Sequence, residues 1–456
     1  MANVVMTTHW TGGDVYPFIR IGSALNQRYG HKVTLVTHSY YEESARRAGL
    51  EFTPFDTPQE WAEFLIDDAK IGNPLANLQG VVDFRTKYQN ESRFMHEYGI
   101  LAPHCAAEDT VLFVRHVDSL AALAVAERLR VPIVTTYMAP SFLSQVFLDN
   151  EIFGEQLVEM LNSFRSALKL PPVRTWLQMW SAPKRVVGLW PAWFDNIAGP
   201  SQQGVTPVGF ALDHACQTPF SPEVESFLAE HKTPILISGG TGKQLKAGFY
   251  DVCVEACAVM NLPAILVTQY EDLVPRNLPD NVRWFKYLPL APLMSRMRAI
   301  MHHGGVNTCA EALAAGIPQL VLGYYYDRPG NGARLKALGV AEYLPPVSWQ
   351  PGIIAEALTR LTAESVRRRC EELAARIRSE DVMSNIDSVI QGAVRNTDLL
   401  IDLSASKDKT QTVGTIDPER QTLDLPKEKR LSLLKELSRD QRAIVAQILR
   451  ERNRTV

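Results

Sequence analysis

Short apolar runs alternate with helical patterns along most of this chain, and the alternation occurs in two series. In the first series, the β-branched runs are residues 3–8, 31–38, 110–116 and 131–137, and the helical patterns between them include residues 16–30 and 119–130. In the second series, the apolar runs are residues 234–240, 263–269, 299–305 and 318–324, and the helical patterns include residues 248–260 and 307–316. Strands that alternate with helices build parallel sheets covered on both faces. The sequence therefore predicts an α/β protein with two doubly wound halves.

Turn-forming residues cluster between the two series, and regular pattern is lost around residues 198–222, so we expect a linker there. We predict an N-terminal Rossmann-like domain at residues 1–210 and a C-terminal Rossmann-like domain at residues 219–385. A helix that returns to the first domain (386–403), a polar linker (404–424) and a helical tail (425–456) follow. Two such domains place a ligand in the central cleft between them, at the carboxyl ends of their strands.

Composition narrows the class of partner. The net charge of −3 gives no electrostatic reason to expect nucleic acid or an anionic membrane. The chain has no run of about 18 apolar residues and no basic segment at its start, so we expect a cytoplasmic protein without stable membrane insertion. The six cysteines are scattered, which favours reduced thiols over a metal site.

The segment at residues 299–316 combines an apolar run, paired histidines, paired glycines and a helical pattern. Gly304 and Gly305 allow the backbone to approach a ligand closely. The free N–H groups of a helix that begins near Asn307 would face an anion, and a histidine adds a donor beside it. Two interpretations stay open at this point: a turn that only packs well, and a cradle for a charged ligand.

The stretch HHGGVNTCAEALAAGIPQ, followed by YYYDRPGNGA, resembles the donor-binding signature of GT-B nucleotide-sugar glycosyltransferases. The likeness is greatest to family 1 and its sterol-type and antibiotic members. The resemblance implies that His303 contacts the phosphates, that Glu311 binds the ribose and that Asp327 holds sugar hydroxyls. It also assigns the diphosphate loop, at Gly305, Asn307 and Thr308. Arg328 stands where the family usually has Gln, and Gly323 where it usually has Pro.

Two further segments of the second half fit the same resemblance. WFKYLPLAPLM resembles the part that carries the nucleobase, which implies that Tyr287 stacks on the base; a core aromatic is the alternative. ISGGTGK resembles the first loop of the donor domain, which implies phosphate contacts from Gly240 and Thr241.

The N-terminal half supplies the other match, because TGGDVYPFIRIGSAL resembles the turn that carries the general base of family 1. The resemblance assigns this role to Asp14, whose unperturbed pKa of about 3.9 requires burial or close positioning. The alternatives are a helix N-cap at Asp14 and a base at His9. We expect His116 or Asp118 to support Asp14. The expected acceptor contacts are Trp10, Gly13 and Tyr137.

These matches predict an inverting, metal-independent glycosyltransferase that moves a sugar from a UDP- or dTDP-linked donor to a hydroxyl of a small hydrophobic natural product. The nucleotide sugar is a co-substrate, and no cofactor is expected. The alternatives are a sterol or lipid glycosyltransferase, a sugar-nucleotide epimerase on the same scaffold and a non-catalytic auxiliary protein. Residues 425–456 suggest two short amphipathic helices for protein docking or a dimer contact.

Overall fold

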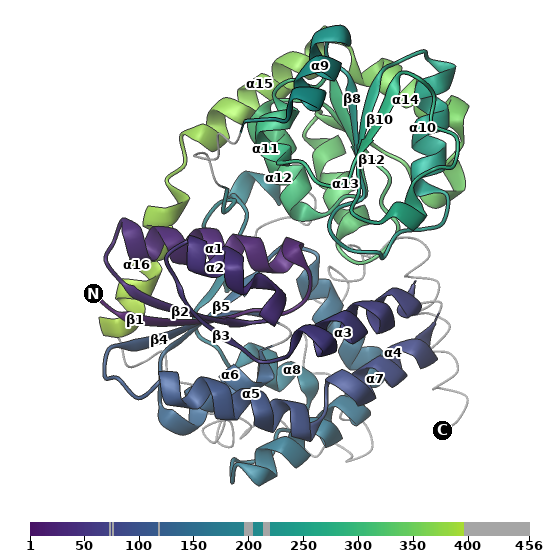
Figure 1. Ribbon diagram of the computed structural model, residues 1–456. Coiled ribbons are helices and arrows are strands. Elements are labelled where there is room, and N and C mark those ends of the chain that lie inside the picture. The colour runs from purple at the N-terminus through teal and green to yellow at the C-terminus, as the bar shows by residue number, and fades with distance from the viewer. Residues whose placement is uncertain (73, 75–76, 117–118, 196–203, 213–218, 396–456) are drawn as a thin grey trace, which may run out of the picture.

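A computed structural model describes residues 1–456 except residues 73, 75–76, 117–118, 196–203, 213–218 and 396–456. Figure 1 shows two α/β units, the N-terminal one in purple and blue and the C-terminal one in green. The predicted tail and its linker, 425–456 and 404–424, lie outside the described residues, as do residues 396–403 of the returning helix and Asp118.

The N-terminal unit is built on a parallel sheet of seven strands in the order β3-β2-β1-β4-β5-β6-β7. The strands are β1 (Asn3–Thr7), β2 (Lys32–Thr37), β3 (Glu51–Pro54), β4 (Thr110–Arg115), β5 (Ile133–Tyr137), β6 (Val186–Gly188) and β7 (Val205–Pro207). The chain adds strands on one side of β1 as far as β3 and then continues on the other side from β4, so the strand order reverses between β1 and β4. Doubly wound sheets bind ligands at this point.

Helices cover this sheet and extend beyond it on one side. They are α1 (Gly12–Gln27), α2 (Glu42–Arg47), α3 (Pro58–Ile71), α4 (Leu78–Tyr88), α5 (Glu91–His104), α6 (Leu120–Leu129), α7 (Phe142–Ala167) and α8 (Trp176–Ser181), with 3₁₀ turns η1 (Ser39–Tyr41) and η2 (Ala192–Phe194). Helix α3 begins sharply because Thr57 and Glu60 form a reciprocal capping box and Pro58 occupies its first turn. In Figure 1, α3, α4 and α7 lie together beneath the C-terminal unit.

The C-terminal unit repeats the topology with six parallel strands in the order β10-β9-β8-β11-β12-β13. The strands are β8 (Ile235–Ser238), β9 (Ala264–Val267), β10 (Val282–Phe285), β11 (Ala299–His302), β12 (Gln319–Val321) and β13 (Ala341–Tyr343). The helices are α9 (Pro222–Glu230), α10 (Phe249–Val259), α11 (Leu290–Met294), α12 (Val306–Ala315), α13 (Arg328–Ala337), α14 (Pro351–Leu361) and α15 (Glu364–Arg378), with turns η3 (Glu271–Leu273) and η4 (Pro346–Ser348).

The last described helix, α16 (Val382–Arg395), leaves the C-terminal unit and packs on α1, β4 and β5 of the first (Figure 1). A buried pair fixes it there, because His31 Nε2 lies 2.7 Å from Asp387 Oδ1. The two units are therefore joined both through the segment that follows β7 and through the start of α16.

Two local expectations were wrong. The segment at residues 198–222, expected to lack regular structure, contains β7, a short edge strand that pairs with β6. Asp14 is not a helix N-cap, because α1 begins earlier than its apolar pattern does and Thr11 takes that position. Asp14 instead lies in the first helical turn, where the helix dipole favours a carboxylate. None of the described helices is long and apolar enough to cross a membrane.

Candidate active site

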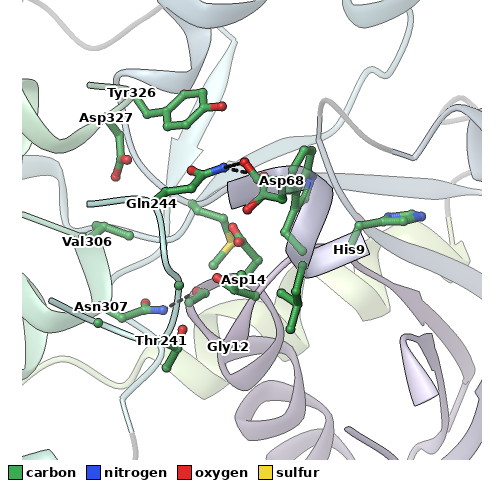
Figure 2. A pocket seen from close by; sticks show the side chains of 18 of the residues that line it. His9, Gly12, Asp14, Asp68, Thr241, Gln244, Val306, Asn307, Tyr326 and Asp327 are labelled. Atoms are coloured by element: carbon green, nitrogen blue, oxygen red, sulfur yellow. Dashed lines mark hydrogen bonds between the residues drawn. The ribbon is translucent and has the colours of Figure 1, made fainter. Parts of the chain in front are cut away.

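A cavity of about 850 Å³ lies between the two units, where the carboxyl ends of β1, β8 and β11 meet α3, α4 and α7. Most of the predicted site residues line it from the two sides, namely His9, Trp10, Gly13 and Asp14 from the first unit and Gly240, Thr241, Tyr287, His303, Gly305, Asn307, Thr308, Glu311, Asp327 and Arg328 from the second. Figure 2 shows Asp14 and Asp327 approaching the same space from opposite units.

Asp14 is held by an arginine that sequence analysis missed. Arg115, the last residue of β4, brings Nη2 to 3.0 Å and Nε to 3.1 Å from Asp14 Oδ1. The two meet because β1 and β4 are neighbouring parallel strands whose carboxyl ends share one edge. Burial raises the pKa of Asp14 above its usual value, while Arg115 opposes part of that rise. The carboxylate is thus more basic than an exposed aspartate and fixed in orientation.

His116 does not support Asp14, which corrects the sequence prediction. Arg115, the last residue of β4, lines the cavity, whereas His116, which follows the strand, does not. The His116 ring packs 4.0 Å from the Tyr137 ring and 4.9 Å from the Trp180 ring, measured between centroids. Burial lowers the pKa of His116 to about 3, so its imidazole is neutral. Tyr137 is buried against it and does not line the cavity, so the expected acceptor contact at Tyr137 was also wrong.

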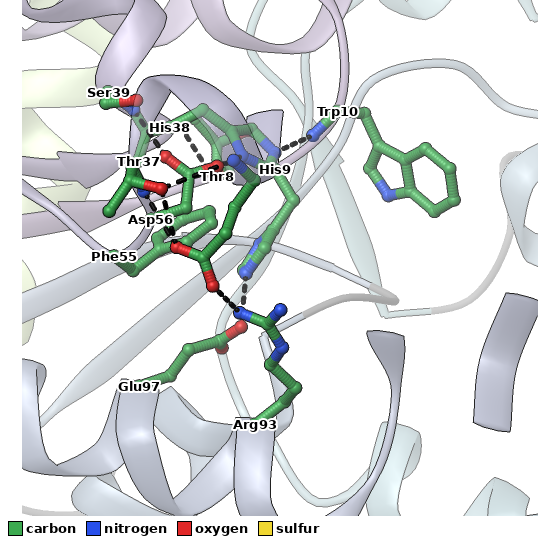
Figure 3. Close-up of polar contacts among 12 residues, drawn as sticks. Thr8, His9, Trp10, Thr37, His38, Ser39, Phe55, Asp56, Arg93 and Glu97 are labelled. Carbon is green, nitrogen blue, oxygen red and sulfur yellow. Dashed lines mark hydrogen bonds and ion pairs between the residues drawn. The ribbon is translucent and has the colours of Figure 1, made fainter. Parts of the chain in front are cut away.

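His9 lines the cavity beside the first unit's helices and forms a pair with a carboxylate (Figure 3). Its Nε2 lies 3.1 Å from Glu97 Oε1, and its ring stacks on Phe55 at 4.7 Å. A carboxylate only accepts hydrogen bonds, so Nε2 carries a proton and donates a hydrogen bond to Glu97. Nδ1 is covered and has no hydrogen-bond partner among the described residues. His9 and Glu97 are therefore a histidine–acid pair, but its free nitrogen is shielded in this conformation.

Trp10 is held in place by a second histidine–acid pair, which sequence analysis missed (Figure 3). Its backbone has φ of +75°, a left-handed conformation that is costly for a bulky residue. Its N–H donates to His38 Nε2 at 3.1 Å, and His38 Nδ1 lies 2.6 Å from Asp56 Oδ2. Burial lowers the pKa of His38, so its neutral ring can accept from Trp10. The Trp10 ring then stacks on Phe84 at 5.6 Å, within the apolar wall of the cavity.

In the second unit, His303 lies between two glycines from different loops. A Cβ atom at Gly240 would come within 2.6 Å of the His303 ring, and one at Gly305 within 2.5 Å. Gly240 also has φ of +80°, so both loops need glycine to enclose the ring. Burial and the neighbouring Arg328 lower the pKa of His303 well below its usual value. The unliganded site therefore holds a neutral imidazole, which acts as a hydrogen-bonding group and not as a fixed charge.

The helix that follows, α12, opens toward the cavity with Gly305 at its N-cap and with Asn307 and Thr308 in its first turn. Such an N-terminus has unpaired N–H groups and a partial positive charge, which suits a phosphate. His302 faces the other way: its Nδ1 accepts from Gly304 N–H at 3.2 Å, and its Nε2 lies 3.1 Å from Gln319 Oε1. The two histidines of the motif therefore differ, since His302 shapes the turn and His303 faces the cavity.

Several donor-side residues already make contacts across the cleft. Arg20 of α1 donates to Glu311 Oε1 at 2.9 Å. Asn307 Nδ2 donates to the Gly13 carbonyl. Tyr287 is 78% exposed at the rim, which excludes the alternative of a core aromatic. The predicted donor half and the predicted acceptor half thus touch through Glu311, Asn307 and Gly13, which sequence analysis assigned to ligands, and through Arg20, which it did not.

Arg328, which replaces the usual Gln of the family, is connected to the first unit through Gln244 and Asp68, and sequence analysis did not find Asp68. Gln244 donates to the Asp68 side chain and, at 3.3 Å, to its carbonyl (Figure 2). Arg328 donates to the Gln244 carbonyl at 2.5 Å. Burial raises the pKa of Asp68 to about 7 and that of Asp327 to about 6. Asp68 and Asp327 therefore both line the cavity with carboxyl groups whose pKa is raised.

The described residues contain no group of three or more His, Cys, Asp or Glu arranged to hold a metal.

Comparison with known proteins agrees with this geometry. The family model for the N-terminal domain of glycosyltransferase family 28 matches residues 4–148. The model for the C-terminal domain of erythromycin biosynthesis protein CIII-like proteins matches residues 254–389. Among solved structures, the glycosyltransferase of kitacinnamycin aligns with a TM-score of 0.69 at 18% identity, over 86% of this chain and 98% of that one. A spinosyn rhamnosyltransferase complexed with thymidine diphosphate aligns with a TM-score of 0.59 at 18% identity, over 85% and 99%.

Two curated relatives are similar to this chain over most of its length. The O-mycaminosyltylonolide 6-deoxyallosyltransferase of Streptomyces fradiae is 26% identical over 85% of this chain and 96% of its own length. The sterol 3-beta-glucosyltransferase UGT80A2 of Arabidopsis thaliana is 26% identical over 83% of this chain, which spans 63% of that relative's length. The matched domains, the two parallel sheets and the residues that meet in the cleft lead to one conclusion: the chain is a glycosyltransferase of the GT-B fold, similar to antibiotic and sterol glycosyltransferases.

Proposed function

We propose that this protein is an inverting, metal-independent glycosyltransferase that moves a sugar from a nucleoside diphosphate donor to a hydroxyl of a small hydrophobic acceptor. One observation carries the proposal. One cavity has a half-buried carboxylate of raised pKa, Asp14, on one unit, and it has a helix N-terminus beside a neutral histidine, His303, on the other. The first group suits the removal of a proton from an acceptor, and the second suits a leaving diphosphate.

In the proposed reaction, the acceptor oxygen attacks the anomeric carbon from the side opposite the diphosphate. Asp14 takes the hydroxyl proton as the new carbon–oxygen bond forms. The bond between the anomeric carbon and the phosphate oxygen breaks, and the diphosphate leaves with the electron pair. The N–H groups at the start of α12 and the His303 ring stabilise the charge that grows on it. Attack from the opposite side inverts the configuration at the anomeric carbon.

The apolar wall of the cavity supports a hydrophobic acceptor. Side chains of α3, α4 and α7 supply most of this wall, among them Trp61, Phe64, Phe84, Phe142, Leu148 and Phe153. Aromatic and aliphatic walls with few polar groups suit a flat or ring-rich apolar molecule. The two relatives are named for O-mycaminosyltylonolide and for a sterol as the molecules that receive the sugar. We propose a natural-product acceptor and a UDP- or dTDP-linked sugar.

His9 is the second candidate base, because its pairing with Glu97 is chemically suited to the task. We favour Asp14, since His9 Nδ1 is covered in this conformation. The test uses a panel of UDP- and dTDP-sugars with 2-naphthol as acceptor, and compares Asp14→Asn with His9→Gln. Asp14→Asn should lose transfer and keep nucleotide affinity within about threefold of the wild-type value. Turnover above about a tenth of the wild-type rate in Asp14→Asn, together with its loss in His9→Gln, would assign the base to His9.

The same panel separates the alternative functions. An epimerase would convert a nucleotide sugar in the absence of any acceptor, and an auxiliary protein would neither transfer the sugar nor hydrolyse the donor. The proposal requires that nucleoside diphosphate appears together with a glycoside of the acceptor, in equal amounts.

A further inference from the structure

Two tyrosines at the mouth of the cavity are exposed although they are large and aromatic. Tyr287, which follows β10 in the second unit, is 78% exposed. Tyr40, in the turn η1 of the first unit, is 58% exposed. Both line the cavity, one from each side of the cleft. Exposed aromatic rings that face a shared opening are typical of a surface that a ligand covers.

Two more tyrosines line the same cavity. Tyr16, on α1, is one of them, and burial first, then the hydroxyls of Tyr40 and Tyr287, raise its pKa above the usual value. Tyr270, which also lines the cavity, has a pKa raised by burial and in part by Tyr40. Tyr270 is anchored by its hydroxyl, which donates to the Thr241 carbonyl at 2.9 Å. The mouth is therefore ringed by four tyrosines, two from each unit.

The two exposed rings differ in how they are supported. Tyr40 stacks on Trp61 at 6.0 Å with an angle of 28° between the planes, and it contacts Tyr41 edge-on at 5.0 Å. Tyr40 is thus backed on one side and has a large part of its surface open. Among the described residues, no ring contact involves Tyr287. A planar aromatic ligand between them would cover apolar surface on both.

The family resemblance already implies that Tyr287 stacks on the nucleobase of the donor. We propose that Tyr40 of the N-terminal unit covers the other face of the same base. The inference rests on the proposed function, because it assumes a nucleoside diphosphate in this cavity. A base held in this way contacts both units at once, so nucleotide binding stabilises the closed cleft before the acceptor reacts. Base stacking tolerates both uracil and thymine, because each base has an aromatic face.

The test measures the binding of UDP, dTDP and inorganic pyrophosphate to the full chain by calorimetry. Tyr40→Ser should weaken UDP and dTDP binding about five- to tenfold, the lower part of the range for one lost stacking contact. Pyrophosphate binding should not change, because it has no base. Tyr40→Phe should restore nucleotide affinity, since it keeps the ring. Ile66→Ala is the matched control: Ile66 is also 58% exposed, lies on α3 of the same unit and does not line the cavity.

A double-mutant cycle with Tyr287→Ser then asks whether the two rings grip the same base. If they do, the loss from Tyr40→Ser shrinks to less than about twofold when Tyr287 is absent. Equal UDP affinity in Tyr40→Ser and wild type would overturn the inference and leave the proposed function intact. A loss of 2-naphthol binding alone would overturn it too, by assigning Tyr40 to the acceptor. A wild-type protein that binds neither nucleotide would refute both.

Discussion

The enclosure of His303 by two glycines leads to a sharp prediction for Gly240→Ala. The new Cβ would lie 2.6 Å from the His303 ring, closer than a non-bonded contact allows. The backbone at this position has φ of +80°, which costs an L-residue about 1–2 kcal/mol. The ring must therefore move, and in the proposed complex it would lose its contact with the diphosphate. A hydrogen bond to a charged group contributes about 1.5–3 kcal/mol, so UDP or dTDP affinity should fall about 10- to 150-fold.

The matched control for this change is Gly242→Ala in the same loop. A Cβ at Gly242 would be 3.8 Å from its nearest neighbour, the Thr11 methyl group, which is an ordinary contact. Its nucleotide affinity should stay within about twofold of the wild-type value. The assay is titration calorimetry, with the melting temperature recorded for each variant to confirm folding. If Gly240→Ala binds nucleotide as well as Gly242→Ala does, His303 is not the phosphate-facing group.

Two further predictions concern charge pairs. Arg115→Met removes the cation that lowers the pKa of Asp14, so the acidic limb of kcat/KM against pH should move to higher pH by about 1–3 units; an unmoved limb would dissociate Arg115 from the base. Arg334 and Asp195 form a buried ion pair at 2.9 Å, so Arg334→Met should lower the free energy of unfolding in urea by about 3–5 kcal/mol. Arg360 pairs with Glu342 at the surface, so Arg360→Met should lower it by less than about 1 kcal/mol. Equal losses would contradict the claim that burial makes the first pair important.

The sequence predicted the fold, and the resemblance to a known family located the turn around His303, because both signals are local. Apolar alternation specifies each strand and helix, and a single stretch of chain contains the turn, His303 and the start of α12. The role of Gly304 and Gly305 could be predicted from the sequence because a glycine has no side chain and therefore lets other groups approach the backbone. The distinction between His302 and His303 also follows from the turn, since only one side of it faces the cavity.

The partners across the cleft could not be predicted in this way. Arg115 lies about a hundred residues from Asp14, and Arg20 lies farther still from Glu311, so only the assembled sheets bring them together. His116 was singled out by its residue type, yet its ring packs on Tyr137 and Trp180 and does not line the cavity. The pairing of β1 with β4 offers the one usable signal, since it places the last residue of β4 beside the turn after β1. The left-handed backbone of Trp10 and its His38–Asp56 support have no signature in the sequence.

The central claim is that Asp14 and the α12 N-terminus lie on opposite sides of the reacting carbon, so that transfer inverts it. The most direct measurement is the configuration of the glycoside formed from an α-linked UDP- or dTDP-sugar and 2-naphthol, read from the anomeric proton coupling in NMR spectra. We predict a β-glycoside that the wild-type protein makes and Asp14→Asn does not. An α-glycoside as the product, or an epimerised nucleotide sugar without any glycoside, would contradict the account.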